Sequence, residues 1–118
     1  MNKVILTGNL TKDIEARQTA NGKNVVSSTI AVNREYKEAD GSYATDFINF
    51  VAWGVQADYL ANYAKKGDRL EIVGRWQVRS YEKDGQKVRV DEVVAESLAV
   101  FTRQPKPTQE VQPDNLPF

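Results

Sequence analysis

The sequence predicts a small all-β domain with a single helix, followed by an extended tail. Three observations support this. Apolar and polar residues alternate at a period of two through most of residues 1–103, helical spacing appears once, at residues 56–66, and all four prolines fall within residues 104–118. A chain of 118 residues fits one domain with a core of its own. We therefore expect a folded domain over residues 1–103 and a disordered tail over residues 104–118.

The first half of the chain predicts three strands. Residues 4–9 alternate, and residues 25–36 form a second run that is rich in β-branched side chains and follows an Asn21-Gly22 turn signal. The polar residues 37–44 contain an Asp-Gly pair and predict a long, mobile loop. Residues 47–53 then form a third strand with aromatic side chains on both faces.

Residues 56–66 predict the one helix, because small and apolar side chains recur there at helical spacing. These side chains are Ala57, Leu60, Ala61 and Ala64. Lys65 and Lys66 suit the negative end of this helix, and Gly67 suits its C-terminal cap.

The remaining residues predict two strands joined by a hairpin. Residues 69–81 alternate, and residues 83–86 form the hairpin tip. The alternation of the return strand slips at residues 92–94, which predicts a bulge or a strand end, and residues 98–101 complete the last strand. Five strands with one helix between the third and the fourth is the order of an OB-fold, a five-stranded Greek-key barrel.

One face of the predicted barrel collects aromatic and basic side chains. Side chains alternate between the two faces of a strand. If Ile48 and Phe50 point into the barrel, the alternate residues of the third strand point outward, and so does one alternate set on the fourth strand. The outward positions are Phe47, Asn49, Val51 and Trp53 on the third strand and Arg75, Gln77, Arg79 and Tyr81 on the fourth. Flat rings stack on any base and cations bind phosphates, so this surface predicts sequence-tolerant binding of single-stranded nucleic acid. The alternative is that Phe47 and Trp53 cover a second core or a subunit interface.

The other aromatic side chains have separate predicted roles. Trp76 has the parity of the core and is interpreted as core or interface, and Phe101 as packing. Tyr59 and Tyr63 lie on the helix and are expected to cover one end of the barrel. Tyr36 lies beside the basic start of the polar loop, where it either stacks on a base or caps the barrel edge.

The composition argues against an enzyme. Cysteine and histidine are both absent, which excludes thiol nucleophiles, histidine-based triads and zinc sites built on these residues. The carboxylates show no spacing of a shared site, and no phosphate-binding glycine motif is present, so no cofactor or metal is expected. Net charge is zero, and no apolar run is long enough to span a membrane, so a cytoplasmic protein is predicted.

Several segments resemble the bacterial and phage single-stranded DNA-binding proteins, especially those of Gram-positive bacteria and their phages. The resemblance rests on residues 1–10 (MNKVILTGNL), 30–34 (IAVNR), 46–53 (DFINFVAW), 63–67 (YAKKG) and 92–97 (EVVAES), and on the closing Pro117-Phe118. It implies a homotetramer of OB-folds wrapped by single-stranded DNA, without enzymatic activity, that protects DNA in replication, recombination and repair. The implied location is the bacterial cytoplasm or nucleoid, or the cytoplasm of an infected host.

The resemblance also implies the site residues. The stacking positions of the family fall on Tyr36, Phe47, Trp53 and Tyr81. Its phosphate contacts fall on Lys3, Arg34, Lys65, Lys66, Arg79, Lys83, Lys87 and Arg89. The family often has tryptophan at two of the stacking positions, where this chain has Tyr36 and Phe47, and the smaller rings predict weaker binding.

The last five residues predict a docking site for other proteins. An apolar tip on a segment too polar to fold is expected to enter another protein's pocket. The resemblance implies that this tip recruits replication, recombination and repair enzymes, with Leu116, Pro117 and Phe118 in the pocket. Asp114 and the terminal carboxylate then meet basic residues around it. Asn115 stands where the family usually has an acid. The short tail suggests a phage or accessory version of the family. The alternative to a docking site is a frayed terminus.

Two other functions stay open on the sequence alone. An OB-fold adaptor would dock replication and repair proteins through the tip and show no salt-dependent affinity for DNA. RNA binding is the other, because a stacking platform does not inspect the 2′-hydroxyl unless a group is placed to do so.

Overall fold

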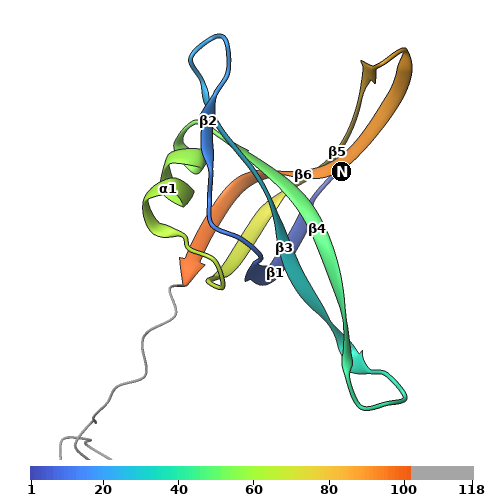
Figure 1. The fold of residues 1–118 in the computed structure, drawn as a ribbon. Coiled ribbons are helices and arrows are strands. Elements are labelled where there is room, and N and C mark those ends of the chain that lie inside the picture. The colour runs from blue at the N-terminus through green and yellow to red at the C-terminus, as the bar shows by residue number, and fades with distance from the viewer. Residues whose placement is uncertain (102–118) are drawn as a thin grey trace, which may run out of the picture.

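In the computed structural model, residues 1–101 form six strands and one helix (Figure 1). The strands are β1 (Val4–Leu10), β2 (Ala16–Gln18), β3 (Asn24–Lys37), β4 (Tyr43–Trp53), β5 (Arg69–Lys83) and β6 (Gln86–Phe101), and the helix is α1 (Val55–Tyr63). The structure describes these residues only, so the expected boundary at residue 103 and the tip at residues 114–118 lie outside the described residues. Among residues 1–101, no helix has the length and hydropathy needed to cross a membrane.

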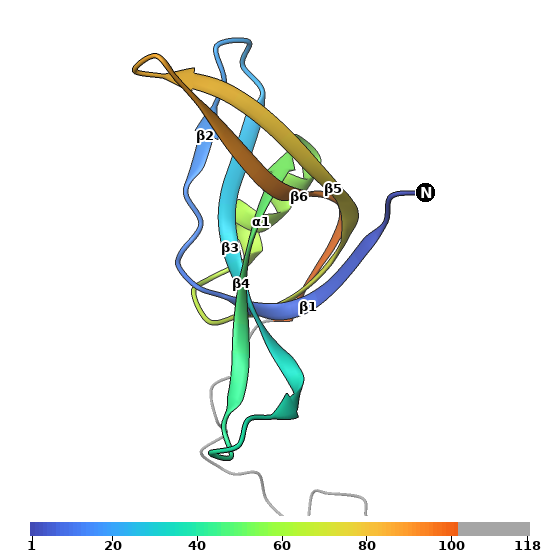
Figure 2. The same cartoon turned by 90° about the vertical axis from the view of Figure 1, so that its right-hand side faces the viewer.

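The strands close into a barrel. The sheet order is β1-β5-β6-β4-β3-β2, and β1 also pairs with β3 through Asn9–Ala31 and Leu10–Ile30, which joins the two ends. Figure 2 shows β1 crossing beneath the barrel while the β3–β4 and β5–β6 hairpins extend away from it. The OB-fold is confirmed, with α1 after the third long strand. The short β2, which pairs with the start of β3, was not predicted because its three exposed residues carry no apolar alternation.

The core lies inside the barrel and is closed at one end by α1. Phe50 of β4 is 1% exposed, as predicted. Ala57 and Leu60 of α1 are fully buried in the same cluster, so the helix covers the barrel with a narrow apolar stripe. The other large buried side chains are Leu10, Val26, Ile30, Leu70, Ile72 and Val93.

The strand end predicted at residues 92–94 is wrong, because β6 continues through them, and the bulge predicted there lies further along, at Glu96. At residues 93–94 β6 pairs with β5 on one edge and runs parallel to β4 on the other. Side chains on both faces of β6 are buried along this stretch, so inward and outward positions do not differ in exposure. The exposed fractions are 5% for Glu92, 0% for Val93, 8% for Val94 and 6% for Ala95.

The pairing of β5 with β6 is irregular between Val73 and Gly74. Val73 pairs with Ser97 and Gly74 with Ala95, so β6 holds one additional residue there. A Cβ atom at Gly74 would clash with the carbonyl oxygen of Val94, so the two strands approach this closely only at a glycine. β6 stays in the barrel as far as its pairing with β4 at Val93 and Val94, and the remaining parts of β5 and β6 extend away from it as a long hairpin (Figure 2).

The two long hairpins end in short turns. The β3–β4 loop is shorter than predicted, at residues 38–42, because both strands extend into the polar segment. Hydrogen bonds from the Glu38 N–H to the Ser42 carbonyl (2.7 Å) and from the Gly41 N–H to the Glu38 carbonyl (2.9 Å) close it. The β5–β6 tip agrees with the prediction, since residues 84–85 both have positive φ, as in a two-residue type I′ turn.

The helix ends earlier than predicted, at Tyr63. Ala64 already has an extended backbone, and the Asp68 carboxylate accepts the Lys65 N–H at 2.8 Å, which draws that donor out of a further helical turn. Gly67 has a φ of 91° in the turn that follows. It therefore serves this turn and not the predicted helix cap.

Three aromatic side chains are more exposed than predicted. Trp76 is 43% exposed, Phe101 51% and Tyr63 61%, so none belongs to the barrel core. Trp76 lies where β5 leaves the barrel, so its parity no longer implies burial, and its role at an interface stays a prediction. Tyr59 packs at the barrel end, where its hydroxyl accepts the Val100 N–H at 3.1 Å.

Candidate nucleic-acid interface

Strand β4 presents two aromatic rings on the outer face of the barrel. Phe47 is 69% exposed and Trp53 is 44% exposed. Their partners across the ladder on β3 are Ala31 for Phe47 and Val25 for Trp53. These partners are too small to cover the rings, so aromatic surface is open for stacking.

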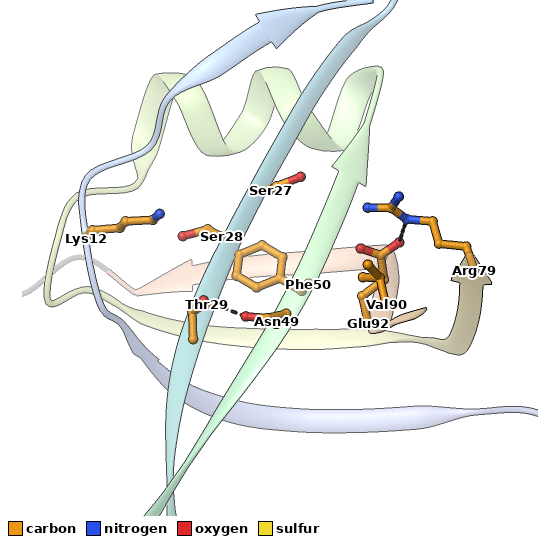
Figure 3. A pocket seen from close by; sticks show the side chains of 9 residues that line it. All are labelled: Lys12, Ser27, Ser28, Thr29, Asn49, Phe50, Arg79, Val90 and Glu92. Carbon is orange, nitrogen blue, oxygen red and sulfur yellow. Dashed lines mark hydrogen bonds and ion pairs between the residues drawn. The ribbon is translucent and has the colours of Figure 1, made fainter. Parts of the chain in front are cut away.

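A groove lies beside these rings, between the β3–β4 face and the β5–β6 hairpin. Two adjoining hollows form it, and Ser27, Arg79 and Glu92 line both. The other lining residues are Lys12, Ser28, Thr29, Asn49, Phe50 and Val90 in the first hollow (Figure 3), and Val25, Val51, Trp53 and Gln77 in the second. Val51 was predicted to point outward and be exposed. It is only 4% exposed, because its side chain lines the groove.

Arg79 stands at the centre of a polar cluster in this groove. Its Nε donates to Oε2 of Glu92 at 2.8 Å, and the same oxygen accepts Nε2 of Gln77 at 3.2 Å. The hydrogen bond to Glu92 raises the pKa of Arg79, so its positive charge is secure. The guanidinium carbon also lies 5.9 Å from the ring centre of Tyr81, which is 44% exposed. The structure thus places Trp53 and Arg79 on one groove, with the Tyr81 ring beside Arg79.

Tyr36 lies on the β3–β4 hairpin beside Arg34. The ring is 61% exposed, and its hydroxyl accepts Nη1 of Arg34 at 3.4 Å. Arg34 also forms a bidentate pair with Asp46, through Nε–Oδ2 at 3.1 Å and Nη2–Oδ1 at 2.9 Å. These bonds raise the pKa of Arg34 and lower the pKa of Asp46. The predicted phosphate contact at Arg34 is therefore already engaged by a carboxylate.

The remaining predicted cations are spread over the barrel. Lys83 and Lys87 flank the β5–β6 tip and form no salt bridge within residues 1–101. Lys3 pairs with Glu96 at 3.1 Å, and Arg89 pairs with an acid of its own strand at 3.0 Å. Lys65 and Lys66 lie in the turn after α1 and do not line the groove.

Two charged groove residues were missed by the sequence reasoning, Lys12 and Glu92. Lys12 lies in the loop after β1, and this loop is one of the usual binding loops of an OB-fold, which was the only available signal. Glu92 carried no signal, because its place in the groove depends on the pairing of β6 with β4 and β5, which are distant in sequence.

Comparison with known proteins finds relatives that are named for single-stranded DNA binding. The "Single-stranded DNA-binding protein" of Streptococcus mutans serotype c is 47% identical over 102 residues, which cover 86% of this chain and 62% of that protein. The "Single-stranded DNA-binding protein" of Bacillus cereus is 50% identical over 99 residues, covering 83% of this chain and 58% of that protein. The chain thus spans about three fifths of the length of these two relatives.

A third relative matches nearly the whole chain. The "Single-stranded DNA-binding protein 4" of Streptococcus agalactiae serotype V is 42% identical over 116 residues, which cover 98% of this chain and 84% of that protein. All three relatives come from Gram-positive bacteria, as the resemblance predicted. The sequence profile of the family described as "Single-strand binding protein family" matches residues 1–101, and the chain belongs to this family.

Proposed function

We propose that this chain binds single-stranded DNA without reading its sequence and protects it during replication, recombination and repair. The observation that carries the proposal is that Trp53 and Arg79 line the same hollow, which joins a stacking surface to a cation. The names of the three relatives describe the same ligand. In this proposal the chain is a binding protein and not an enzyme, and it needs no cofactor.

The proposed contacts divide between bases and phosphates. Bases stack on Tyr36, Phe47, Trp53 and Tyr81. Phosphates contact Lys3, Arg34, Lys65, Lys66, Arg79, Lys83, Lys87 and Arg89, and Lys12 joins them because it lines the groove. Each stacked base contributes about 1–3 kcal/mol, while the phosphate contacts make binding weaken as salt rises.

We further propose that the barrel assembles with copies of itself, as a homotetramer. Among residues 1–101, no second strand pairs with β1 over residues 4–8, so one edge of that stretch is open. Ile5 on this strand is 72% exposed, and Trp76 and Val78 on the neighbouring β5 are 43% and 49% exposed. An open edge beside apolar side chains favours association with a second copy. Sedimentation of the full chain tests it: a single species at four times 13.3 kDa is expected, and a monomer at micromolar concentration would rule the assembly out.

The tail has a separate proposed role. The tip of the segment 104–118, formed by Asp114, Asn115, Leu116, Pro117 and Phe118, recruits replication and repair enzymes in the cytoplasm. This role is independent of the groove, so each can be removed without the other.

Tryptophan fluorescence tests the proposed DNA binding. In a Trp76→Phe variant, Trp53 is the only tryptophan, so its emission reports stacking at that site. Titration with oligo-dT is expected to quench it, less strongly at high salt, while duplex DNA of equal length has no effect. A Trp53→Phe variant, which keeps Trp76, is the matched control and should show much less quenching. Absence of quenching and of competition by oligo-dT would refute the proposal and favour the adaptor function.

A further inference from the structure

The groove contains a carboxylate that the proposed function does not require. Glu92 lines both hollows, and its side chain is only 7% exposed, whereas the side chain of Arg79 is 50% exposed. A negative group beside the path of a polyanion opposes binding through its charge alone. A favourable contribution of Glu92 must therefore come from what it holds in place.

Glu92 holds one edge of the Arg79 guanidinium. Oε2 of Glu92 binds Nε of Arg79 at 2.8 Å and is supported by Nε2 of Gln77 at 3.2 Å. The terminal Nη1 and Nη2 atoms of Arg79 make no hydrogen bond within residues 1–101. Figure 3 shows the guanidinium reaching from β5 toward β4, with its bond to Glu92 as a dashed line. The outer edge of the fork is thus presented to the groove.

The same bond places Arg79 against an aromatic ring. The guanidinium carbon lies 5.9 Å from the ring centre of Tyr81, two residues further along the same face of β5. Arg79 is therefore held by Glu92 on one side and by Tyr81 on the other. An exposed arginine otherwise samples many rotamers, and ordering them on binding reduces affinity.

We propose that Glu92 is a positioning residue for DNA binding: it fixes Arg79 so that the outer edge of the guanidinium meets a phosphate while Tyr81 stacks on the adjacent base. This inference rests on the proposed function. It assigns a role to Glu92, the buried carboxylate of the groove. It also explains why the ion pair of Glu92 and Arg79 lies within the binding surface. It also predicts that Glu92 acts only through Arg79.

A double-mutant cycle in the full chain tests this dependence. Arg79→Ala is expected to weaken oligo-dT binding roughly tenfold, and Glu92→Ala about five- to tenfold. The double variant should bind no more than twofold more weakly than Arg79→Ala. Both single variants should lower the salt slope of binding by about one phosphate contact, which a purely structural role would not do. Glu82→Ala, which removes an unpaired acid from the same hairpin, is the matched control and should not weaken binding.

Two conservative variants separate the positioning role of Glu92 from its charge. They also replace Glu92→Ala in the test if urea unfolding shows that variant to be less stable than the wild type. Glu92→Gln removes the charge but keeps an oxygen that can accept Nε of Arg79, so binding should stay within about threefold of wild type. Glu92→Asp keeps the charge but is one methylene too short to reach, and it should weaken binding like Glu92→Ala. The inference would be overturned if Glu92→Gln weakened binding more than Glu92→Asp. It would also be overturned if the loss of affinity in the double variant were the product of the losses in the two single variants. Failure of the wild-type chain to bind oligo-dT would instead refute the proposed function, and the inference with it.

Discussion

Asp46 occupies the edge of Arg34 that a DNA phosphate would use. The two residues lie across the β3–β4 ladder and share two hydrogen bonds of 3.1 and 2.9 Å, while the third arm of the fork reaches the Tyr36 hydroxyl at 3.4 Å. Carboxylate and phosphate present the same bidentate geometry to a guanidinium. In the proposed complex, Asp46 would therefore compete with DNA for this arginine.

Replacing Asp46 by asparagine should release Arg34 for DNA. We expect Asp46→Asn to tighten oligo-dT binding about two- to fourfold at low salt and to steepen its salt dependence. Thermal stability should hardly change, because exposed ion pairs contribute little. Asp40→Asn, in the same hairpin, is the matched control, since Asp40 bonds only Ser42. Equal effects of the two variants would show that net charge, and not the pairing of Arg34, sets the affinity.

The stacking surface can be tested ring by ring. Trp53→Ala and Tyr81→Ala should each weaken oligo-dT binding by about 1–3 kcal/mol, because each removes one π-face. Tyr63→Ala is the control, since Tyr63 is 61% exposed on α1 and does not line the groove. Fluorescence anisotropy of labelled oligo-dT measures all three. Wild-type affinity in both test variants would refute the stacking assignment.

The β4 strand shows what the sequence could and could not predict about this surface. Alternation predicts the exposure of Phe47 and Trp53, because the side chains of a strand alternate with the pleat. It fails for Val51, which has the same parity but is only 4% exposed, because it faces Gln77 and Arg79 of the β5–β6 hairpin across the groove. Alternation reports which face a side chain is on. It does not report what a distant hairpin brings against that face.

The same limit applies to β5 and β6. Glu92 breaks the local pattern because its side chain is buried in a groove that is also lined by residues of β4, some forty residues earlier. Trp76 keeps the core parity of Leu70 and Ile72, yet it is 43% exposed, because it lies where β5 leaves the barrel. The order of strands and helix can be predicted from local sequence patterns. The polar cluster around Arg79 cannot, because it depends on how strands distant in sequence align with one another.

Binding should be nearly independent of pH between about 5.5 and 7.5. The chain has no histidine, so no side chain has its usual pKa in this interval. The pKa of Asp46 is lowered by Arg34, so their pair is fully formed above the ordinary carboxyl pKa of about 4 and is lost as pH falls through the lower folded value. Oligo-dT, whose bases do not gain protons here, is the suitable probe. A titration step near pH 6.5 would contradict this expectation.

Gly74 should be intolerant of any side chain. A Cβ atom there would clash with the backbone of β6, so Gly74→Ala should cost about 3 kcal/mol or more of unfolding free energy. Gly41→Ala is the matched control, because Gly41 has open space around it and a φ of 89°, and the strain there costs only about 1–2 kcal/mol. Urea unfolding of both variants gives the comparison. A smaller loss at Gly74 than at Gly41 would show that the two strands separate easily at this point.

Removing Phe118 should separate recruitment from DNA binding. The proposed tip is apolar and joined to the barrel by a proline-rich segment, so its loss should leave oligo-dT affinity within twofold of wild type. Capture of replication and repair enzymes on the immobilised chain should be abolished, because the pocket would lose the aromatic side chain and the terminal carboxylate would move to Pro117. Val111→Ala, which changes an apolar residue within the same tail, is the matched control and should retain capture. If the chain lacking Phe118 binds the same enzymes as the wild type, recruitment belongs to the barrel surface and the tip has no part in it.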